Sequence, residues 1–196
     1  MKADIILSGV GGQGILSVAA TLGTAALQEG LYMKQSEVHG MSQRGGDVSS
    51  NMRISDKPIA SDLIPKGKAD AIISVEPMES LRYISWLKPE GWLITNSKPF
   101  KNISNYPDLE EIYAEIKKIK NHIIIDADTI AKELKSLRSS NIVMLGAATP
   151  FLEVNFDSLK KALQTIFATK GQEIIDKNIA ALEKGREFAM AEIKNR

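Results

Sequence analysis

Glycines gather in the segment GVGGQG, residues 9–14, which directly follows a short apolar run. Gly9, Gly11 and Gly14 match the pattern G-x-G-x-x-G, and the residues that follow repeat apolar side chains at helical spacing. Glycines at a strand-to-helix junction permit a tight turn, and the free N–H groups at a helix start favour a phosphate or carboxylate. The pattern predicts a cofactor-binding loop, made of Gly9, Gly11, Gly12, Gln13 and Gly14.

Two alternative roles for these glycines stay open. The glycines can simply let the first helix pack closely on the sheet, because motifs of this kind produce false matches. They can also belong to a dinucleotide site, which needs an acid after the second strand to bind the ribose. Glu37 lies 23 positions beyond Gly14, near the expected spacing of ~20. The ligand of the loop could therefore be a nucleotide, coenzyme A or thiamine diphosphate.

A second dense segment, EVHGMSQRGG, runs from Glu37 to Gly46. Arg44 could bind a carboxylate or phosphate in fork geometry, or it could pair with Glu37 inside the fold. Gln43 could orient a substrate carbonyl, and His39 could either donate a proton or hydrogen-bond a neighbouring carbonyl. We take His39, Gln43 and Arg44 as candidate catalytic residues, and the same three with Glu37 as candidate cofactor contacts.

The composition excludes several classes of function. Lys and Arg number 25 against 24 Asp and Glu, so the chain lacks the basic excess of a general nucleic-acid binder. No span approaches the ~20 apolar residues of a membrane helix, which predicts a cytoplasmic protein. Without cysteines, and with only two histidines, the chain is expected to hold neither an iron–sulfur cluster nor another metal by itself. A redox centre would have to lie in another chain.

Strands and helices are expected to alternate along the chain. The expected strands span residues 3–7, 32–36, 48–54, 58–63, 69–75, 91–95 and 122–127, with a further apolar segment at 142–145. The expected helices span residues 15–30, 78–87, 109–120, 128–137, 157–167 and 172–193. Residues 37–47 are expected to form a loop, and 48–54 is expected to pair with 58–63 as a β-hairpin.

This order predicts a Rossmann-like α/β fold, in which an open, mainly parallel sheet has helices on both faces. We expect one domain over residues 1–196, with the hairpin as an insertion and helices at the C-terminus. The glycine loop follows the first strand and EVHGMSQRGG follows the second. They should therefore lie together at the carboxyl edge of the sheet, where α/β proteins place ligands.

Three segments of the chain resemble the gamma-type family of 2-oxoacid:ferredoxin oxidoreductases. These segments are GVGGQGIL, EVHGMSQRGGDVSSNMRI and PKGKADAIISVEPMESLRYISWLKPEG. Within the family, EVHGMSQR and EPMESLRYI look most like the beta subunits of the indolepyruvate-specific members. The resemblance covers residues 5–91 closely, and continues more loosely through NIVMLGAAT, residues 141–149.

The resemblance implies a small subunit that binds no cofactor alone and is inactive alone. Its partner would be a large subunit that holds thiamine diphosphate, Mg²⁺ and 4Fe–4S clusters. The complex would convert aryl 2-oxoacids and coenzyme A to acyl-CoA, with electrons passing to ferredoxin. Alternatives are a gamma subunit for pyruvate, 2-oxoglutarate or ketoisovalerate, a stand-alone nucleotide-binding oxidoreductase, and a non-catalytic scaffold. A homodimer of the isolated chain is also open.

Overall fold

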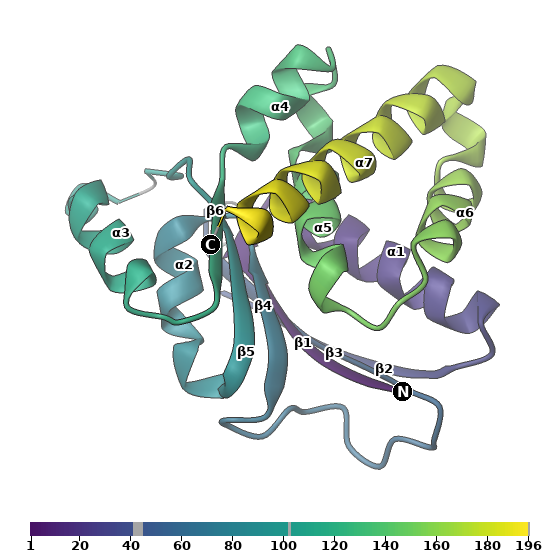
Figure 1. Ribbon diagram of the computed structural model, residues 1–196, viewed down its shortest axis with the longest axis horizontal. Coiled ribbons are helices and arrows are strands. Elements are labelled where there is room, and N and C mark those ends of the chain that lie inside the picture. The colour runs from purple at the N-terminus through teal and green to yellow at the C-terminus, as the bar shows by residue number, and fades with distance from the viewer. Residues whose placement is uncertain (41–44, 102, 196) are drawn as a thin grey trace.

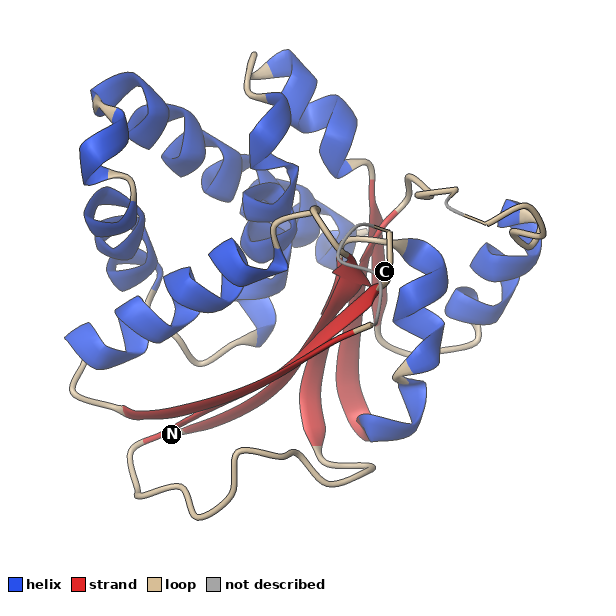
Figure 2. Cartoon of the chain, turned by 180° about the vertical axis from the view of Figure 1, so that it is seen from behind, coloured by secondary structure: helices blue, strands red, loops and turns tan. Residues whose placement is uncertain are grey.

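The computed structural model describes residues 1–40, 45–101 and 103–195 of the chain. They form a six-stranded sheet with helices packed on both faces (Figures 1 and 2). The strands are β1 (Lys2–Val10), β2 (Tyr32–His39), β3 (Asp47–Ser55), β4 (Ala69–Ser74), β5 (Leu87–Asn96) and β6 (His122–Ile125). Their order across the sheet is β2-β3-β1-β4-β5-β6.

The sheet is mixed, with one strand reversed. β1, β4, β5 and β6 pair in parallel, whereas β3 is antiparallel to both of its neighbours, β1 and β2. β2 therefore points the same way as β1, although β3 lies between them. The prediction of an open, mainly parallel α/β sheet is confirmed.

Helices cover both faces of the sheet, as predicted. One face carries α1 (Ile15–Gln28), α4 (Ala127–Glu133), α5 (Ser140–Ala148), α6 (Phe156–Ile166) and α7 (Gln172–Lys194). The other face carries α2 (Pro77–Arg82) and α3 (Leu109–Lys117). A separate cluster of buried apolar side chains fills the space under each layer. The apolar segment at 142–145 proves to be the middle of α5, every residue of which from Asn141 to Ala148 is buried.

The expected hairpin between residues 48–54 and 58–63 is wrong. β1 is nearly all buried, so its backbone needs a hydrogen-bonded strand on each side. β3 has the same length of nine residues, and it pairs with β1 in unbroken register from Lys2↔Ser55 to Val10↔Asp47. The chain's hairpin is instead β2–β3. Side chains of β3 hold residues 58–64: Asn51 Oδ1 accepts a hydrogen bond from the Ile64 N–H at 3.1 Å.

The expected boundaries of other elements also shift. The sequence predicts Glu37, Val38 and His39 in a loop, but the ladder with β3 continues through His39↔Val48, so β2 includes them. α2 ends at Arg82, and a short 3₁₀ turn, Ile84–Trp86, leads directly into β5.

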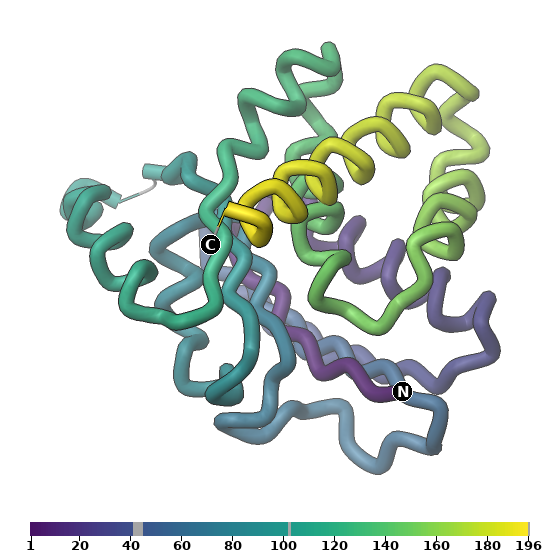
Figure 3. The backbone as a smooth tube through the Cα atoms, viewed as in Figure 1, coloured from purple at the N-terminus to yellow at the C-terminus, as the bar shows by residue number. Residues whose placement is uncertain are grey.

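Two glycines let α5 and α7 touch through their backbones. A Cβ atom on Gly146 would lie 2.1 Å from the carbonyl oxygen of Leu182, and one on Gly185 would lie 2.0 Å from that of Val143. Both distances are far below any real van der Waals contact. Figure 3 shows α7 (yellow) running across α5 toward β6.

A buried ion pair links β1, β3 and the connection to β4. The Asp4 carboxylate is 1% exposed and accepts hydrogen bonds from Arg53 Nε at 2.7 Å and Nη2 at 3.2 Å. Arg53 Nη1 also donates to the carbonyls of Ser61 and Leu63 at 3.1 and 3.0 Å. One guanidinium therefore fixes residues 58–64 against the amino end of the sheet.

We expect Arg53→Met to lower the free energy of unfolding by about 3 kcal/mol, because it leaves the buried Asp4 carboxylate without its main partner. Urea unfolding with an unchanged m-value measures the loss. The double variant Asp4→Leu/Arg53→Met is the control and should recover part of the stability, since no buried charge then stays unpaired. A single variant as stable as the wild type would contradict this account of the ion pair.

Candidate functional site

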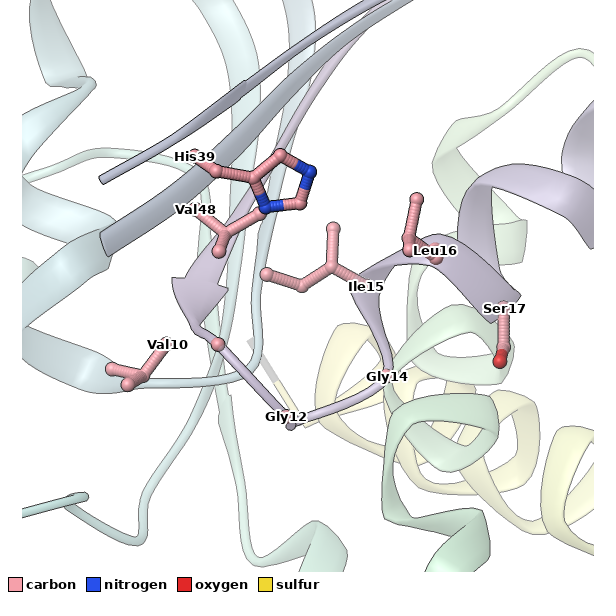
Figure 4. Close-up of a pocket in the computed structure, with 9 residues that line it drawn as sticks. Val10, Gly12, Gly14, Ile15, Leu16, Ser17, His39 and Val48 are labelled. Carbon is pink, nitrogen blue, oxygen red and sulfur yellow. The ribbon is translucent and has the colours of Figure 1, made fainter. Parts of the chain in front are cut away.

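The glycine loop lies at the carboxyl end of β1 and lines a cavity of about 400 Å³ (Figure 4). The loop itself contributes Gly11, Gly12 and Gly14, and the start of α1 contributes Ile15, Leu16 and Ser17. The opposite wall comes from the hairpin, through His39 at the end of β2 and Val48 near the start of β3. The cavity therefore lies between the first strand, the first helix and the β2–β3 hairpin.

Different structural constraints explain why glycine stands at each position of the loop. Gly12 and Gly14 have φ angles of +100° and +82°, a left-handed region that glycine adopts without strain. A Cβ on Gly9 would lie 2.3 Å from Val75 Cγ2, whereas one on Gly12 would meet nothing within 4 Å. Close packing against Val75, the residue after β4, thus accounts for Gly9. It does not account for Gly12, which is exposed beside the cavity.

The Gln13 side chain braces the loop from within. Its Oε1 accepts a hydrogen bond from the Val10 N–H at 2.8 Å, and its Nε2 donates to the Val75 carbonyl at 3.4 Å. The amide group thus joins the ends of the neighbouring strands β1 and β4. Between these two strands the strand order of the sheet reverses, which is where open α/β sheets bind ligands. The sequence predicts Gln13 as a cofactor contact, and in the structure its side chain contributes to the shape of the loop.

The first turn of α1 presents unpaired donors. The backbone N–H groups of Gly12, Gly14, Ile15 and Leu16 have no hydrogen-bond acceptor among the residues that the structure describes. Gly14 is the N-cap residue, and no acidic side chain occupies the first turn. The positive end of the helix dipole adds to these donors, so this arrangement suits a phosphate or another anion.

His39 reaches the cavity from the end of β2. Alternation along the strand places Gln35, Glu37 and His39 on one face. The His39 ring pairs through Nε2 with Glu37 Oε1, and Glu37 Oε2 accepts a hydrogen bond from Gln35 Nε2 at 3.2 Å. The ring is 58% exposed and extends toward Ile15 at the start of α1 (Figure 4). His39 and Glu37 are thus close neighbours on one face of β2.

The two predicted segments do meet at the carboxyl edge. The Gly11 N–H donates to the Gly46 carbonyl at 2.9 Å, which joins the glycine loop to the hairpin connection. The structure brings Gly11, Gly12, Gly14 and His39 around one cavity. Gln43 and Arg44 lie outside the described residues.

Sequence reasoning missed a buried acid next to this edge. Glu76 follows β4 and is completely buried, and its Oε2 caps α2 by accepting the Glu79 N–H at 2.8 Å. Its Oε1 accepts hydrogen bonds from the Phe100 N–H at 3.2 Å and the Tyr106 hydroxyl at 2.5 Å. Burial and this hydrogen bond to Glu76 raise the pKa of Tyr106 above its ordinary value. The signal was in the sequence, since EPME places an acid before proline and a second acid three residues later.

Asn141 was also not singled out from the sequence. This residue lies in the first turn of α5, far from the glycine loop in sequence, and its Nδ2 donates to the Gly14 carbonyl at 2.8 Å. It follows two serines and directly precedes the apolar run that begins at Ile142, so its position at the start of a buried helix was a usable signal.

Two further properties concern the described residues only. No three histidine, aspartate or glutamate side chains among them gather as metal ligands would. None of the helices in the described part of the chain has the length and apolarity needed to cross a membrane.

A model of the pyruvate ferredoxin/flavodoxin oxidoreductase family matches residues 4–188 of the chain. The chain belongs to this family. The family resemblance seen in the three sequence segments is therefore confirmed, and the match extends beyond them through α5 and most of α7.

Relatives and a solved structure agree with the family assignment. The chain is 37% identical to an indolepyruvate oxidoreductase subunit IorB from Pyrococcus horikoshii, over 93% of each chain. It is 30% identical to the common gamma subunit of the pyruvate/ketoisovalerate oxidoreductases from Pyrococcus furiosus, over 94% of this chain and 95% of that one. It is similar in fold to the pyruvate oxidoreductase subunit PORC of Thermotoga maritima, with a TM-score of 0.70, 26% identity and coverage of 95% and 96%.

Proposed function

We propose that this chain is the small subunit of an indolepyruvate:ferredoxin oxidoreductase. The observation that carries the proposal is the 37% identity to an indolepyruvate oxidoreductase subunit over 93% of both chains. The assembly would oxidatively decarboxylate aryl 2-oxoacids to acyl-CoA and pass the electrons to ferredoxin. We place it in the cytoplasm.

The chemistry assigns the redox centres to a larger partner subunit. Decarboxylation of a 2-oxoacid needs the carbanion stabilisation that thiamine diphosphate supplies, and the electrons need a metal or flavin carrier. This chain has no cysteine, the residue that holds iron–sulfur clusters. The partner would therefore hold thiamine diphosphate with its Mg²⁺ and the 4Fe–4S clusters.

The cavity at the glycine loop gives this chain a direct part in ligand binding. Both thiamine diphosphate and coenzyme A carry a diphosphate, and the unpaired N–H groups at the start of α1 fit such a group. In the proposal, the backbone N–H groups of Gly12 and Gly14 and of the first residues of α1 bind the diphosphate. Gly11, whose own N–H is bonded to the Gly46 carbonyl, lines the cavity beside them. His39 contacts it from the end of β2. Gln43 and Arg44 are proposed as further contacts from the sequence alone, since they lie outside the described residues.

A second candidate function is a gamma subunit that serves pyruvate or branched 2-oxoacids. The 30% identity to the pyruvate/ketoisovalerate gamma subunit of P. furiosus favours it. The two candidates share the fold and the partner class, and they differ in the side chain of the 2-oxoacid.

Turnover by the complex tests the proposal. The chain would be co-expressed with the large oxidoreductase subunit of its own organism and assayed with coenzyme A and a dye acceptor. We expect kcat/KM for indolepyruvate to exceed that for pyruvate and 2-oxoisovalerate by about 100-fold, the scale on which a binding pocket separates side chains. Preference for a small 2-oxoacid would support the second candidate, and a complex that oxidises none of the three would overturn both.

A further inference from the structure

The direction of the N–H groups in the first turn of α1 depends on one peptide plane. In a trans peptide the carbonyl and the following N–H point in opposite directions. The Gly14 carbonyl points into the molecule, where it accepts hydrogen bonds from the Ser17 N–H at 3.0 Å and the Asn141 Nδ2 at 2.8 Å. The N–H of Ile15, which shares that peptide, is thereby turned the other way, and Ile15 lines the cavity.

Asn141 and Gly14 fit each other closely. Asn141 is 5% exposed, and a Cβ on Gly14 would lie 2.5 Å from its Nδ2. Any other residue at position 14 would push the Asn141 side chain off the loop. Asn141 Oδ1 is buried and accepts no hydrogen bond from any described residue. A buried acceptor without a partner is unfavourable, which indicates that the side chain is kept for its donor.

We propose that Asn141 is a positioning residue for a diphosphate-binding site at the glycine loop. Its amide, held in the buried helix α5, fixes the Gly14–Ile15 peptide so that the unpaired N–H groups face the ligand. Gln13 braces the loop at its other end. The identity of the ligand rests on the proposed function, whereas the position of the site rests on the structure alone.

An asparagine is suited to this position and an aspartate is not. A carboxylate cannot donate to the Gly14 carbonyl while ionised, and it would add a negative charge beside the donors of the helix start. The isosteric variant Asn141→Asp therefore changes the anion site with almost no change in side-chain volume.

The direct test uses the full chain labelled with ¹⁵N and titrated with inorganic pyrophosphate. In the wild type, the amide resonances of Gly12, Gly14, Ile15 and Leu16 should shift together on binding. Asn141→Asp should weaken that binding at least about tenfold, since both a fixed donor array and a favourable field are lost. Asn141→Ala removes the donor without adding charge and should weaken binding to a smaller extent.

Asn178→Asp provides a matched control. Asn178 is equally buried at 5% exposed, but its side chain bonds Ser139 and the Ile174 carbonyl, away from the loop. It reports the effect of a buried carboxylate on the fold alone, and its pyrophosphate affinity should match the wild type. If Asn141→Asp does not fold, Asn141→Ala decides the result.

The reconstituted complex then identifies the source of the diphosphate. If coenzyme A binds at the loop, Asn141→Asp should raise the KM for coenzyme A. If thiamine diphosphate binds there, the variant should instead need a higher concentration of thiamine diphosphate for activation. The inference would be overturned if pyrophosphate did not shift these amide resonances in the wild type. It would also be overturned if Asn141→Asp bound pyrophosphate as tightly as the wild type does. Normal pyrophosphate binding in a complex that oxidises no 2-oxoacid would instead overturn the proposed function.

Discussion

Replacing Gly185 with alanine is expected to lower the free energy of unfolding by about 3 kcal/mol, because the new methyl group would collide with backbone rather than with a mobile side chain. The contacting atom is the Val143 carbonyl oxygen, 2.0 Å from the ideal Cβ position. α5 and α7 would have to separate, which opens the buried interface between them. Urea unfolding measures the change, and the midpoint of thermal unfolding should fall by roughly 10 °C.

The control for this variant is Ala191→Gly, at an exposed position of the same helix. That change should cost about 1 kcal/mol through helix propensity alone. In Gly185→Ala, helix propensity alone would raise the stability, so any loss of stability in that variant comes from packing. A Gly185→Ala variant that gains stability would show that the two helices do not touch at this point.

The second large effect concerns activity. Purified alone, the chain should oxidise no 2-oxoacid, because it lacks both the electron sink and the electron carrier that the reaction needs. Addition of the large subunit to the same preparation should restore turnover, which serves as the control for a correctly folded chain. Reduction of a dye by indolepyruvate in the presence of this protein alone would refute the division of labour between the subunits.

The sequence was a good guide where one local pattern decides the structure. The glycine run after an apolar strand predicted the β1–α1 turn, and the apolar runs predicted the parallel strands β4 and β6. The meeting of the glycine loop with the hairpin followed from topology, since both segments come after strands that point the same way.

The errors arose where distant segments compete for one partner. Nothing local shows that β3 fills the place beside β1, because that choice depends on the buried backbone of a strand far earlier in the chain. The same limit hid Asn141, whose role depends on the fold bringing α5 under the glycine loop. The place of Glu37 beside His39 depends on β2 continuing past residue 36, which the glycines of the next segment concealed.

The reversed strand β3 has a consequence for the way the chain is made. β1 is made before its two neighbours in the sheet, β3 and β4, which end at Ser55 and Ser74. In a growing chain, this apolar strand has no partner until β3 has left the ribosome, and one of its edges stays open until β4 has followed. The β2–β3 hairpin joins residues that are close in sequence, so it can form before β1 is in place. β1 is then added to neighbours that are made after it, and fragments that stop before residue 74 should be prone to aggregation because one edge of β1 is left open.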